Sequence, residues 1–295
     1  MPKTGIALIV TSVALLSGCG GSSEGRETVV AAFYPLAFAA ERVAGDTVDV
    51  RNLTPPGVEP HDVELSGRDI QAVSEAALVL YLGRGFQPAL EDAVQSTGAT
   101  AVDLLEGLDL LSAAVAARES EDENGVDAST IDPHLWLDPT RYAAVVERIG
   151  SELGRETQAQ ELIAELNALD EEFLAGLTDC ERREVVTSHA AFAYLADRYD
   201  LEQVAITGLS PGAEPTPGEL ERVVSEVRER GATTVFFETL VSPRLARTVA
   251  REVGAATAVL NPLEGLSQEE LDEGADYFSV MRDNLAALRD ALGCR

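Results

Sequence analysis

Three histidines are the side chains of this 295-residue chain best suited to chemistry, and each lies where an apolar run meets a turn. His61 lies in Pro-Pro-Gly-Val-Glu-Pro-His-Asp, His134 in Asp-Pro-His-Leu-Trp-Leu-Asp-Pro, and His189 in Val-Val-Thr-Ser-His-Ala-Ala-Phe. A neutral imidazole nitrogen is a common ligand of borderline transition metals. A single histidine is more often structural or solvated, but three at positions where folds deliver side chains to clefts favour a metal site.

The elements that must position these histidines alternate between strand and helix along the first part of the chain. Apolar or alternating runs predict strands at 28–33, 48–53, 77–81 and 100–104. Helical spacing of apolar residues predicts helices at 36–43, 66–75 and 86–96. This alternation is typical of a mostly parallel sheet with helices on its faces.

The alternation restarts after a long helical region. Residues 139–153 and 156–177 have helical spacing, and the second run contains no proline and no glycine before Gly176. Strands are predicted at 184–187, 203–206, 233–237 and 256–260, and helices at 190–199, 219–230, 243–253 and 276–292. The helix at 156–177 is long against a mean near 11 or 12 residues.

The predicted fold class is therefore α/β with two lobes, each a mostly parallel sheet flanked by helices, joined by one long rigid helix. We expect an N-terminal lobe at 28–138, a linking helical region at 139–179 and a C-terminal lobe at 180–295. Ligands of open α/β sheets bind beyond the carboxyl ends of the strands. The histidines, together with Glu238 and Asn261 at the ends of two strands, are therefore expected to meet in a cleft between the lobes.

The N-terminus has the pattern of an export signal. Lys3 precedes an apolar run that is shorter than the roughly 20 residues of a membrane-spanning helix. The sequence Leu16-Ser17-Gly18-Cys19 resembles the lipobox of bacterial lipoproteins. This resemblance implies a signal peptide at 1–18, lipidation of Cys19 and a flexible tether at 19–27. An ordinary cleaved signal with an incidental cysteine is the alternative.

Two cysteines, Cys180 and Cys294, remain once Cys19 is set aside. Disulfides persist outside the cytosol, so we expect this pair to be bonded and to attach the C-terminus to the body of the protein. Two unpaired buried thiols are the alternative.

The formal net charge of −29 argues against a nucleic-acid partner, which would require a basic face. Part of this charge lies in a polar, acidic stretch at 118–130, which we expect to be a mobile, solvated loop.

Five segments occur in the order seen in one known family: Phe33-Tyr34-Pro35-Leu36, Pro55–Asp62, Asp132–Pro139, Ser188–Phe192 and Phe237-Glu238. In these segments the chain resembles the metal-binding lipoproteins of ABC transporters, the zinc- and manganese-uptake receptors called cluster A-I or cluster 9. The resemblance covers essentially the whole chain after Cys19. It implies two lobes joined by a long helix, with a metal ion held between them.

By this resemblance His61, His134 and His189 are metal ligands, and a histidine at the third position is typical of zinc receptors. Imidazole suits zinc, whereas carboxylate and carbonyl oxygens suit manganese. The family's usual fourth ligand is an aspartate in a late turn, where this chain has Asn261. We therefore expect Glu238 as the fourth ligand, with Asn261 or a water molecule as alternatives.

The function expected from these observations is that of an extracytoplasmic zinc receptor, anchored to the cell membrane at the cell surface or in the periplasm. It would deliver Zn²⁺ as transported ligand to the permease of an ABC transporter, as a monomer and without catalysis. A manganese receptor is the nearest alternative. A zinc hydrolase and a surface adhesin are alternatives of other classes, although the chain has no His-Glu-x-x-His motif.

Overall fold

The computed structural model describes Met1, residues 26–112 and residues 130–295. The signal peptide expected at 1–18, Cys19 and most of the tether at 19–27 lie outside the described residues, apart from Met1. The acidic loop expected at 118–130 lies outside them as well, apart from Thr130. Within the described residues, no helix combines the length and the apolar character needed to cross a membrane.

The first described sheet has four parallel strands in the order β2-β1-β3-β4. They are β1 (Thr28–Ala31), β2 (Asp49–Asn52), β3 (Leu78–Tyr81) and β4 (Ala101–Asp103). The two central strands have apolar sequences, TVVA and LVLY, because a parallel strand inside an α/β lobe is covered on both faces. The connecting segments contain α1 (Tyr34–Ala44), the short 3-10 helices η1 (Gly45–Thr47) and η2 (Pro60–Asp62), α2 (Gly67–Glu75) and α3 (Pro88–Thr97).

The second described sheet repeats this arrangement in the order β6-β5-β7-β8, again with parallel pairing. Its strands are β5 (Glu184–Thr187), β6 (Glu202–Ala205), β7 (Thr234–Phe237) and β8 (Ala256–Val259). The helices of this part are α7 (Ala193–Arg198), α8 (Pro217–Arg230), α9 (Arg244–Val253), α10 (Gln268–Asp272) and α11 (Tyr277–Leu292). Val227 of α8 and Val249 of α9 belong to a separate apolar cluster with Val186 and Val235 of this sheet.

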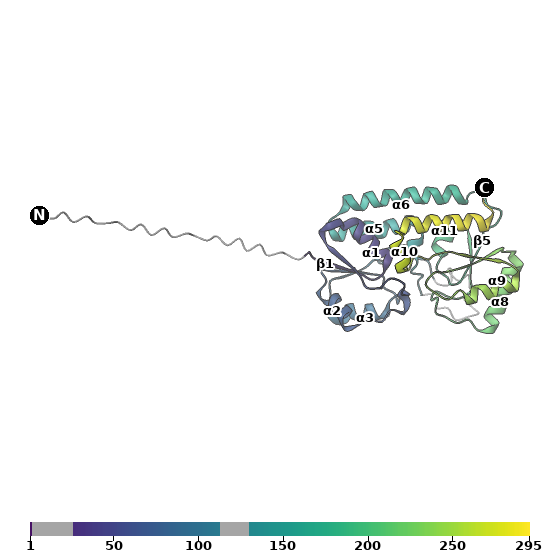
Figure 1. Cartoon of the computed structure of the whole chain (residues 1–295), viewed down its shortest axis with the longest axis horizontal. Helices are drawn as coiled ribbons and strands as arrows, with labels where there is room; N and C mark the ends of the chain where they lie inside the picture. Colours follow the sequence, from purple (N-terminus) through teal and green to yellow (C-terminus); the bar gives the residue numbers. More distant parts are fainter. Residues whose placement is uncertain (2–25, 113–129) are drawn as a thin grey trace.

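In the sequence, the segment between the two sheets forms the 3-10 helix η3 (Leu135–Leu137), then α5 (Pro139–Leu153) and α6 (Glu156–Leu177). With 22 residues, α6 is about 33 Å long at 1.5 Å per residue, and it runs along the top of both lobes in Figure 1. Its buried residues recur every three or four positions: Ala159, Leu162, Leu166, Leu169, Phe173 and Leu177. This buried stripe places α6 on α5 and α11, so one apolar core extends across both lobes.

The C-terminal helix contacts both lobes. The aromatic ring of Tyr277, at the start of α11, stacks on Phe38 of α1 with ring centroids 5.8 Å apart. Just beyond the other end of this helix, Cys294 is bonded to Cys180 across 114 residues. The predicted disulfide is thus confirmed, and it attaches the end of the chain to the segment between α6 and β5.

The predicted α/β fold of two parallel-sheet lobes flanked by helices is confirmed. The strands and the long helix lie close to their expected bounds. The five-residue helix α10 was not expected, because it is too short to show helical periodicity. Its N-terminus does have a readable signal, since Ser267 and Glu270 form a capping box.

Candidate metal centre

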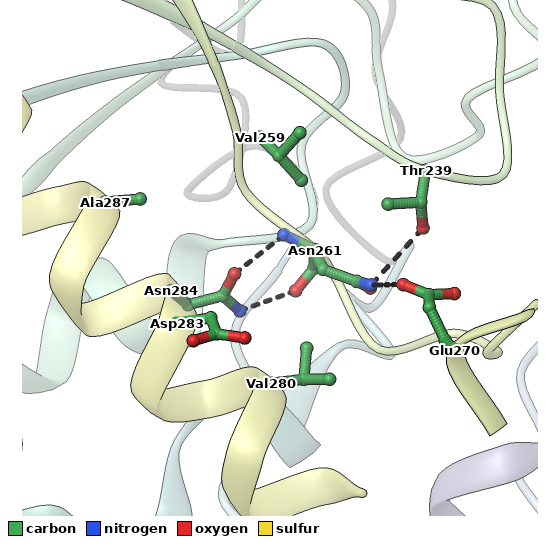
Figure 2. Close-up of a pocket in the computed structure, with 8 residues that line it drawn as sticks. All are labelled: Thr239, Val259, Asn261, Glu270, Val280, Asp283, Asn284 and Ala287. Carbon is green, nitrogen blue, oxygen red and sulfur yellow. Dashed lines mark hydrogen bonds between the residues drawn. The ribbon is translucent and has the colours of Figure 1, made fainter. Parts of the chain in front are cut away.

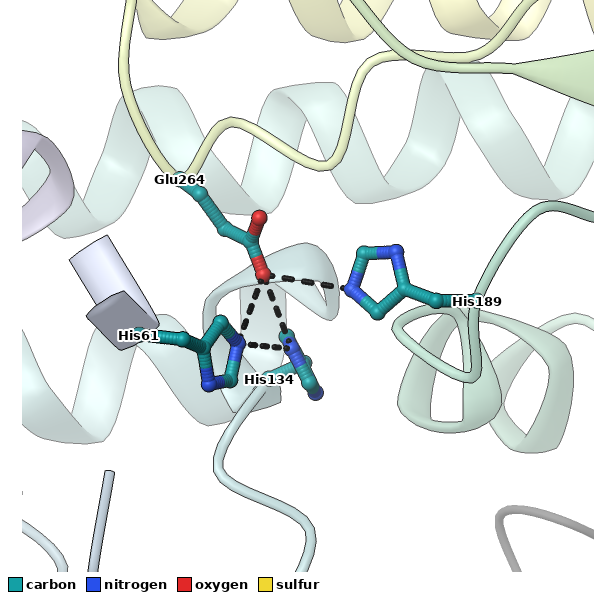
Figure 3. Close-up of side chains that lie close together, drawn as sticks. All are labelled: His61, His134, His189 and Glu264. Atoms are coloured by element: carbon teal, nitrogen blue, oxygen red, sulfur yellow. Dashed lines mark hydrogen bonds and ion pairs between the residues drawn. The ribbon is translucent and has the colours of Figure 1, made fainter. Parts of the chain in front are cut away.

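Four side chains from distant parts of the sequence meet between the two lobes. They are His61, His134, His189 and Glu264, and their ligand atoms all lie within 4.8 Å of one another (Figure 3). His134, His189 and Glu264 are buried, and only 10% of the side chain of His61 is exposed. The three imidazoles point their Nε2 atoms at one carboxylate oxygen, Oε1 of Glu264.

His61 is positioned by the short helix η2 that follows the turn after β2. The Glu59 side chain accepts a hydrogen bond from the backbone N–H of His61 at 3.1 Å and so caps this helix. The amide nitrogen of Gln87 donates to the carbonyl of Pro60 at 3.2 Å. The ring of Phe86 meets the His61 imidazole edge to face, with centroids 4.7 Å apart. Because its backbone and ring are both held, His61 presents Nε2 to the centre.

His134 is held by Asp132 at the start of η3. The Oδ1 atom of Asp132 lies 2.6 Å from Nδ1 of His134 and also accepts from the His134 backbone N–H at 2.9 Å. An ionised carboxylate only accepts, so Nδ1 of His134 is the donor and Nε2 faces the centre. All three groups are buried, which keeps water from competing for these bonds.

His189 follows β5, and its imidazole is held in the same way from the neighbouring strand. Glu238, directly after β7, accepts from Nδ1 of His189 at 2.7 Å and also from the hydroxyl of Ser188. The hydroxyl of Thr187 donates to the carbonyl of His189 at 2.7 Å. The parallel pairing of β5 with β7 brings these carboxyl ends together, as the sequence predicted.

Glu264 comes from the loop between β8 and α10 and is 1% exposed. Its Oε1 atom lies 3.1 Å from Nε2 of His61, 3.0 Å from Nε2 of His134 and 3.3 Å from Nε2 of His189. Its other carboxylate oxygen, Oε2, is buried without a hydrogen-bond partner among the described residues.

The pKa is lowered for His61 but raised for His134 and His189, whose Nδ1 atoms each contact a carboxylate. Burial lowers the pKa of His61, and its contact with the carboxylate of the cluster only partly offsets that effect. Burial also opposes the charged form of His134, but the Asp132 carboxylate outweighs it and leaves this pKa raised. The same balance, with Glu238 as the main opposing charge, holds the pKa of His189 well above its usual value.

The two carboxyl groups of this region respond in opposite directions. Burial would raise the pKa of Glu264, but the charge of His189 and the hydrogen bonds from all three imidazoles hold it well below its usual value. Burial raises the pKa of Glu59 to about 9, and repulsion from Glu264 adds to the effect. The buried Glu264 carboxylate thus favours the charged forms of His134 and His189, and these in turn favour its own charged form.

Four of the six separations between the donor atoms are close to those around a tetrahedral metal ion, and all six are within 4.8 Å. Zinc bonds of about 2.0–2.1 Å to nitrogen and oxygen place tetrahedral ligand atoms about 3.3 Å apart. The contacts of Glu264 Oε1 with the three Nε2 atoms span 3.0–3.3 Å, and the Nε2 atoms of His61 and His134 are 3.3 Å apart. A cation at this point would compete with protons for the imidazole nitrogens.

The structure brings the three predicted histidines together but places the two expected fourth ligands elsewhere. Glu238 lies behind His189, at Nδ1 rather than Nε2. The side-chain amide of Asn261 bonds to Leu263, Thr239 and Glu270. Sequence reasoning missed Glu264, although it is one carboxylate in the otherwise neutral run Leu-Asn-Pro-Leu-Glu-Gly-Leu, and that isolation was a usable signal.

The family model for "Zinc-uptake complex component A periplasmic" matches residues 29–291 of this chain. The high-affinity zinc uptake system protein ZnuA of Bacillus subtilis is 34% identical over 310 aligned residues, which cover 98% of this chain and 97% of that protein. The zinc-binding protein AdcA of Streptococcus pyogenes is 34% identical over 90% of this chain. The matched part is 56% of the length of AdcA.

Solved structures of zinc- and metal-binding proteins are also similar to this chain. The Zn(II)-bound ZnuA-like domain of Streptococcus pneumoniae AdcA superposes with a TM-score of 0.74 and 32% identity, over 91% of this chain and 99% of that domain. The laminin-binding protein Lmb of Streptococcus agalactiae, described as having adhesin and metal-transporting activity, gives a TM-score of 0.78 and 28% identity. The superposition covers 90% of this chain and 99% of the Lmb chain.

Proposed function

The chain belongs to the family of periplasmic zinc-uptake complex component A proteins, and we propose that it is an extracytoplasmic zinc receptor that delivers Zn²⁺ to an ABC permease. The observation that supports this most directly is the convergence of three imidazole nitrogens and one carboxylate oxygen on a single buried point. The relatives named for high-affinity zinc uptake and zinc binding support the same function.

The donor set favours zinc over manganese. Three nitrogens and one oxygen within 4.8 Å of one another suit Zn²⁺, whereas Mn²⁺ takes a larger share of oxygen ligands. We propose His61, His134, His189 and Glu264 as the ligands. In this assignment Glu238 serves as the Nδ1 acceptor that orients His189, and Asn261 serves in the loop that presents Glu264.

The same geometry argues against a zinc hydrolase. A catalytic zinc keeps one position open for water, whereas this centre offers four protein ligands. Three of the four residues are fully buried, which leaves little access for a substrate. We therefore propose a transport function without catalysis.

The proposed setting follows from the N-terminal sequence. We propose that residues 1–18 direct export and that Cys19 is lipidated, so that a monomeric receptor is attached to the outer face of the cell membrane through the tether at 19–27. The lobes at 28–138 and 180–295, with the helical region at 139–179, would then face the permease.

Zinc affinity tests the proposal. Competition with a chromophoric chelator measures tight binding that direct calorimetry cannot resolve, and one Zn²⁺ per chain is expected for the metal-free protein. His134→Ala should abolish tight binding, and Glu264→Gln should weaken it severely because the site loses its anionic ligand. Glu269→Gln removes an exposed carboxylate from the nearby α10 and should leave the affinity unchanged. Weak binding by the parent protein, or tight binding by the His134 variant, would refute the proposal.

Adhesion is a second candidate, favoured by the description of Lmb as both an adhesin and a metal transporter. The two functions separate in a variant in which His61, His134 and His189 are all replaced by alanine. If this variant folds and still binds laminin as the parent does, adhesion is independent of the metal centre. If neither protein binds laminin, adhesion to laminin is excluded.

A further inference from the structure

The loop that carries Glu264 is closed into a ring by one carboxylate. Residues 261–267 leave the end of β8 and enter α10, and Glu270 lies one turn into that short helix. Oε1 of Glu270 accepts from the side-chain amide of Asn261 at 3.2 Å. Its Oε2 accepts from the backbone N–H and the hydroxyl of Ser267, both at 2.7 Å. One side chain thus holds both ends of the loop.

Asn261 is the other half of this closure, and each of its polar groups is bonded. Its backbone N–H and carbonyl pair with the side chain of Asn284 on α11, at 2.8 and 2.7 Å. Its side-chain oxygen accepts from the Leu263 backbone N–H at 2.8 Å, which supports Leu263 at a φ of 55°. Its side-chain nitrogen donates to Glu270 and to the hydroxyl of Thr239 (Figure 2). This network sets the direction in which the chain turns towards Glu264.

The ring is also attached to the first lobe. The indole N–H of Trp136 donates to the carbonyl of Pro262 at 2.8 Å, and the backbone N–H of Gly57 donates to the carbonyl of Leu266 at 2.9 Å. Residues 260–266 are all buried, so the loop has little room to change shape while its ends are held. The outer side of the closure borders a surface pocket of about 370 Å³ lined by Asn261, Glu270 and Asn284.

We propose that Glu270 is a positioning residue for the metal centre: by joining Asn261 to Ser267 it holds the loop in the conformation that places the Glu264 carboxylate against the three imidazoles. The proposal rests on the proposed function, with Glu264 as a ligand. Because the loop ends are fixed before the metal arrives, the anionic ligand does not have to be ordered on binding. Groups that orient a metal ligand typically change metal affinity by roughly 10- to 100-fold when they are replaced.

A swap of donor and acceptor tests this role. Glu270→Gln can keep the bonds to Ser267 through its oxygen but turns an NH₂ group towards the NH₂ group of Asn261, so the ring opens. Asn261→Asp instead faces Glu270 with a second carboxylate. The double variant Asn261→Asp/Glu270→Gln restores each bond with donor and acceptor exchanged, because the introduced glutamine amide can donate to the introduced carboxylate. A double-mutant cycle then isolates this contact.

Glu219→Gln is the matched control. Glu219 forms the same kind of capping box with Thr216 at the start of α8, but within the described part of the chain it bonds neither the Glu264 loop nor a histidine. The readouts are zinc affinity by chelator competition and the visible absorption of the Co²⁺-substituted protein, which distinguishes four protein ligands from three ligands and water.

We expect roughly 10- to 100-fold weaker zinc binding and an altered Co²⁺ spectrum for each single variant at the ring, and parent-like values for the double variant and for Glu219→Gln. If Glu270→Gln binds zinc as the parent does, or if the double variant is no better than the single ones, the positioning role is refuted. If a single variant does not fold, the double variant decides by the same criterion. Failure of the parent itself to bind zinc would instead refute the proposed function.

Discussion

Replacement of Asp132 by asparagine tests how much the metal centre depends on the charge behind His134. The carboxylate accepts two buried hydrogen bonds through Oδ1, from Nδ1 of His134 at 2.6 Å and from the His134 backbone N–H at 2.9 Å. Bonds to an ionised acceptor are roughly twice as strong as neutral ones. In Asp132→Asn the oxygen can keep both bonds, but the new NH₂ group takes the place of Oδ2, which is buried without a partner among the described residues.

We expect Asp132→Asn to weaken zinc binding by roughly 10- to 100-fold, or about 1.4–2.7 kcal/mol. The size of the loss should depend on pH. The Asp132 carboxylate raises the pKa of His134, so protons compete with zinc in the parent from a higher pH downwards. In the variant burial acts without this opposing charge and the pKa of His134 falls. The affinity gap should therefore be widest at high pH and narrow as the pH is lowered.

The assay is chelator competition at a series of pH values between about 6 and 8.5. Asp138→Asn is the matched control, because Asp138 is also a buried aspartate that accepts a backbone N–H, from Thr140 at 2.8 Å, but it caps α5 instead of holding an imidazole. The control should lower stability and leave zinc affinity unchanged. Equal affinities for parent and Asp132→Asn, or a gap that widens as the pH falls, would refute the reasoning.

Three further outcomes are expected from the contacts described above. Because its pKa is raised in the folded state, protonated His189 stabilises the zinc-free protein at pH values below the pKa of the unfolded chain, near 6.5, and this contribution is lost as the pH rises through the folded pKa. The increase in thermal stability caused by added zinc should therefore grow from pH 6 to 8.5. A zinc effect that does not change with pH would contradict this. The double variant Cys180→Ser/Cys294→Ser removes the disulfide that joins residues 114 positions apart, and its free energy of unfolding in denaturant should be lower by about 2–4 kcal/mol. An unchanged denaturation midpoint would show that the disulfide does not stabilise the fold. Gly150→Ala should destabilise the protein by about 1–3 kcal/mol despite the better helix propensity of alanine, because the added Cβ would lie 2.4 Å from Cβ of Ala159. The double variant Gly150→Ala/Ala159→Gly should recover most of this stability, and a single variant more stable than the parent would disprove the close contact of α5 with α6.

Much of the fold could be predicted because its elements have strong local patterns. The central strands are short apolar runs such as LVLY, and α6 repeats its buried residues every three or four positions over 22 residues. The α10 helix could not be found in this way, because five residues complete little more than one turn. Its capping box at Ser267 is a local signal of its N-terminus, and it also indicates a partner for Glu270.

The fourth residue of the centre, its one acidic group, shows where the sequence was insufficient. Glu238 and Glu264 both follow strands of the second sheet, and strand-end position alone favours Glu238. The choice between them depends on which imidazole nitrogen each carboxylate reaches, and Nδ1 and Nε2 of His189 lie on different sides of the same ring. No spacing in the sequence specifies the orientation of that ring.

By itself the sequence determined the strands, the longer helices, the two-lobed α/β class, the three histidines and the cysteine pair, because these depend on residue type or on periods of two to four residues. Only the tertiary structure decided that Glu264 meets His61 across 203 residues and His189 across 75, and that Glu238 and Asn261 support rather than complete the cluster. The physical reason is that a tetrahedral centre requires positions accurate to a few tenths of an ångström. Such accuracy comes from the hydrogen bonds and burial of loops between lobes, and not from the local pattern of any one segment.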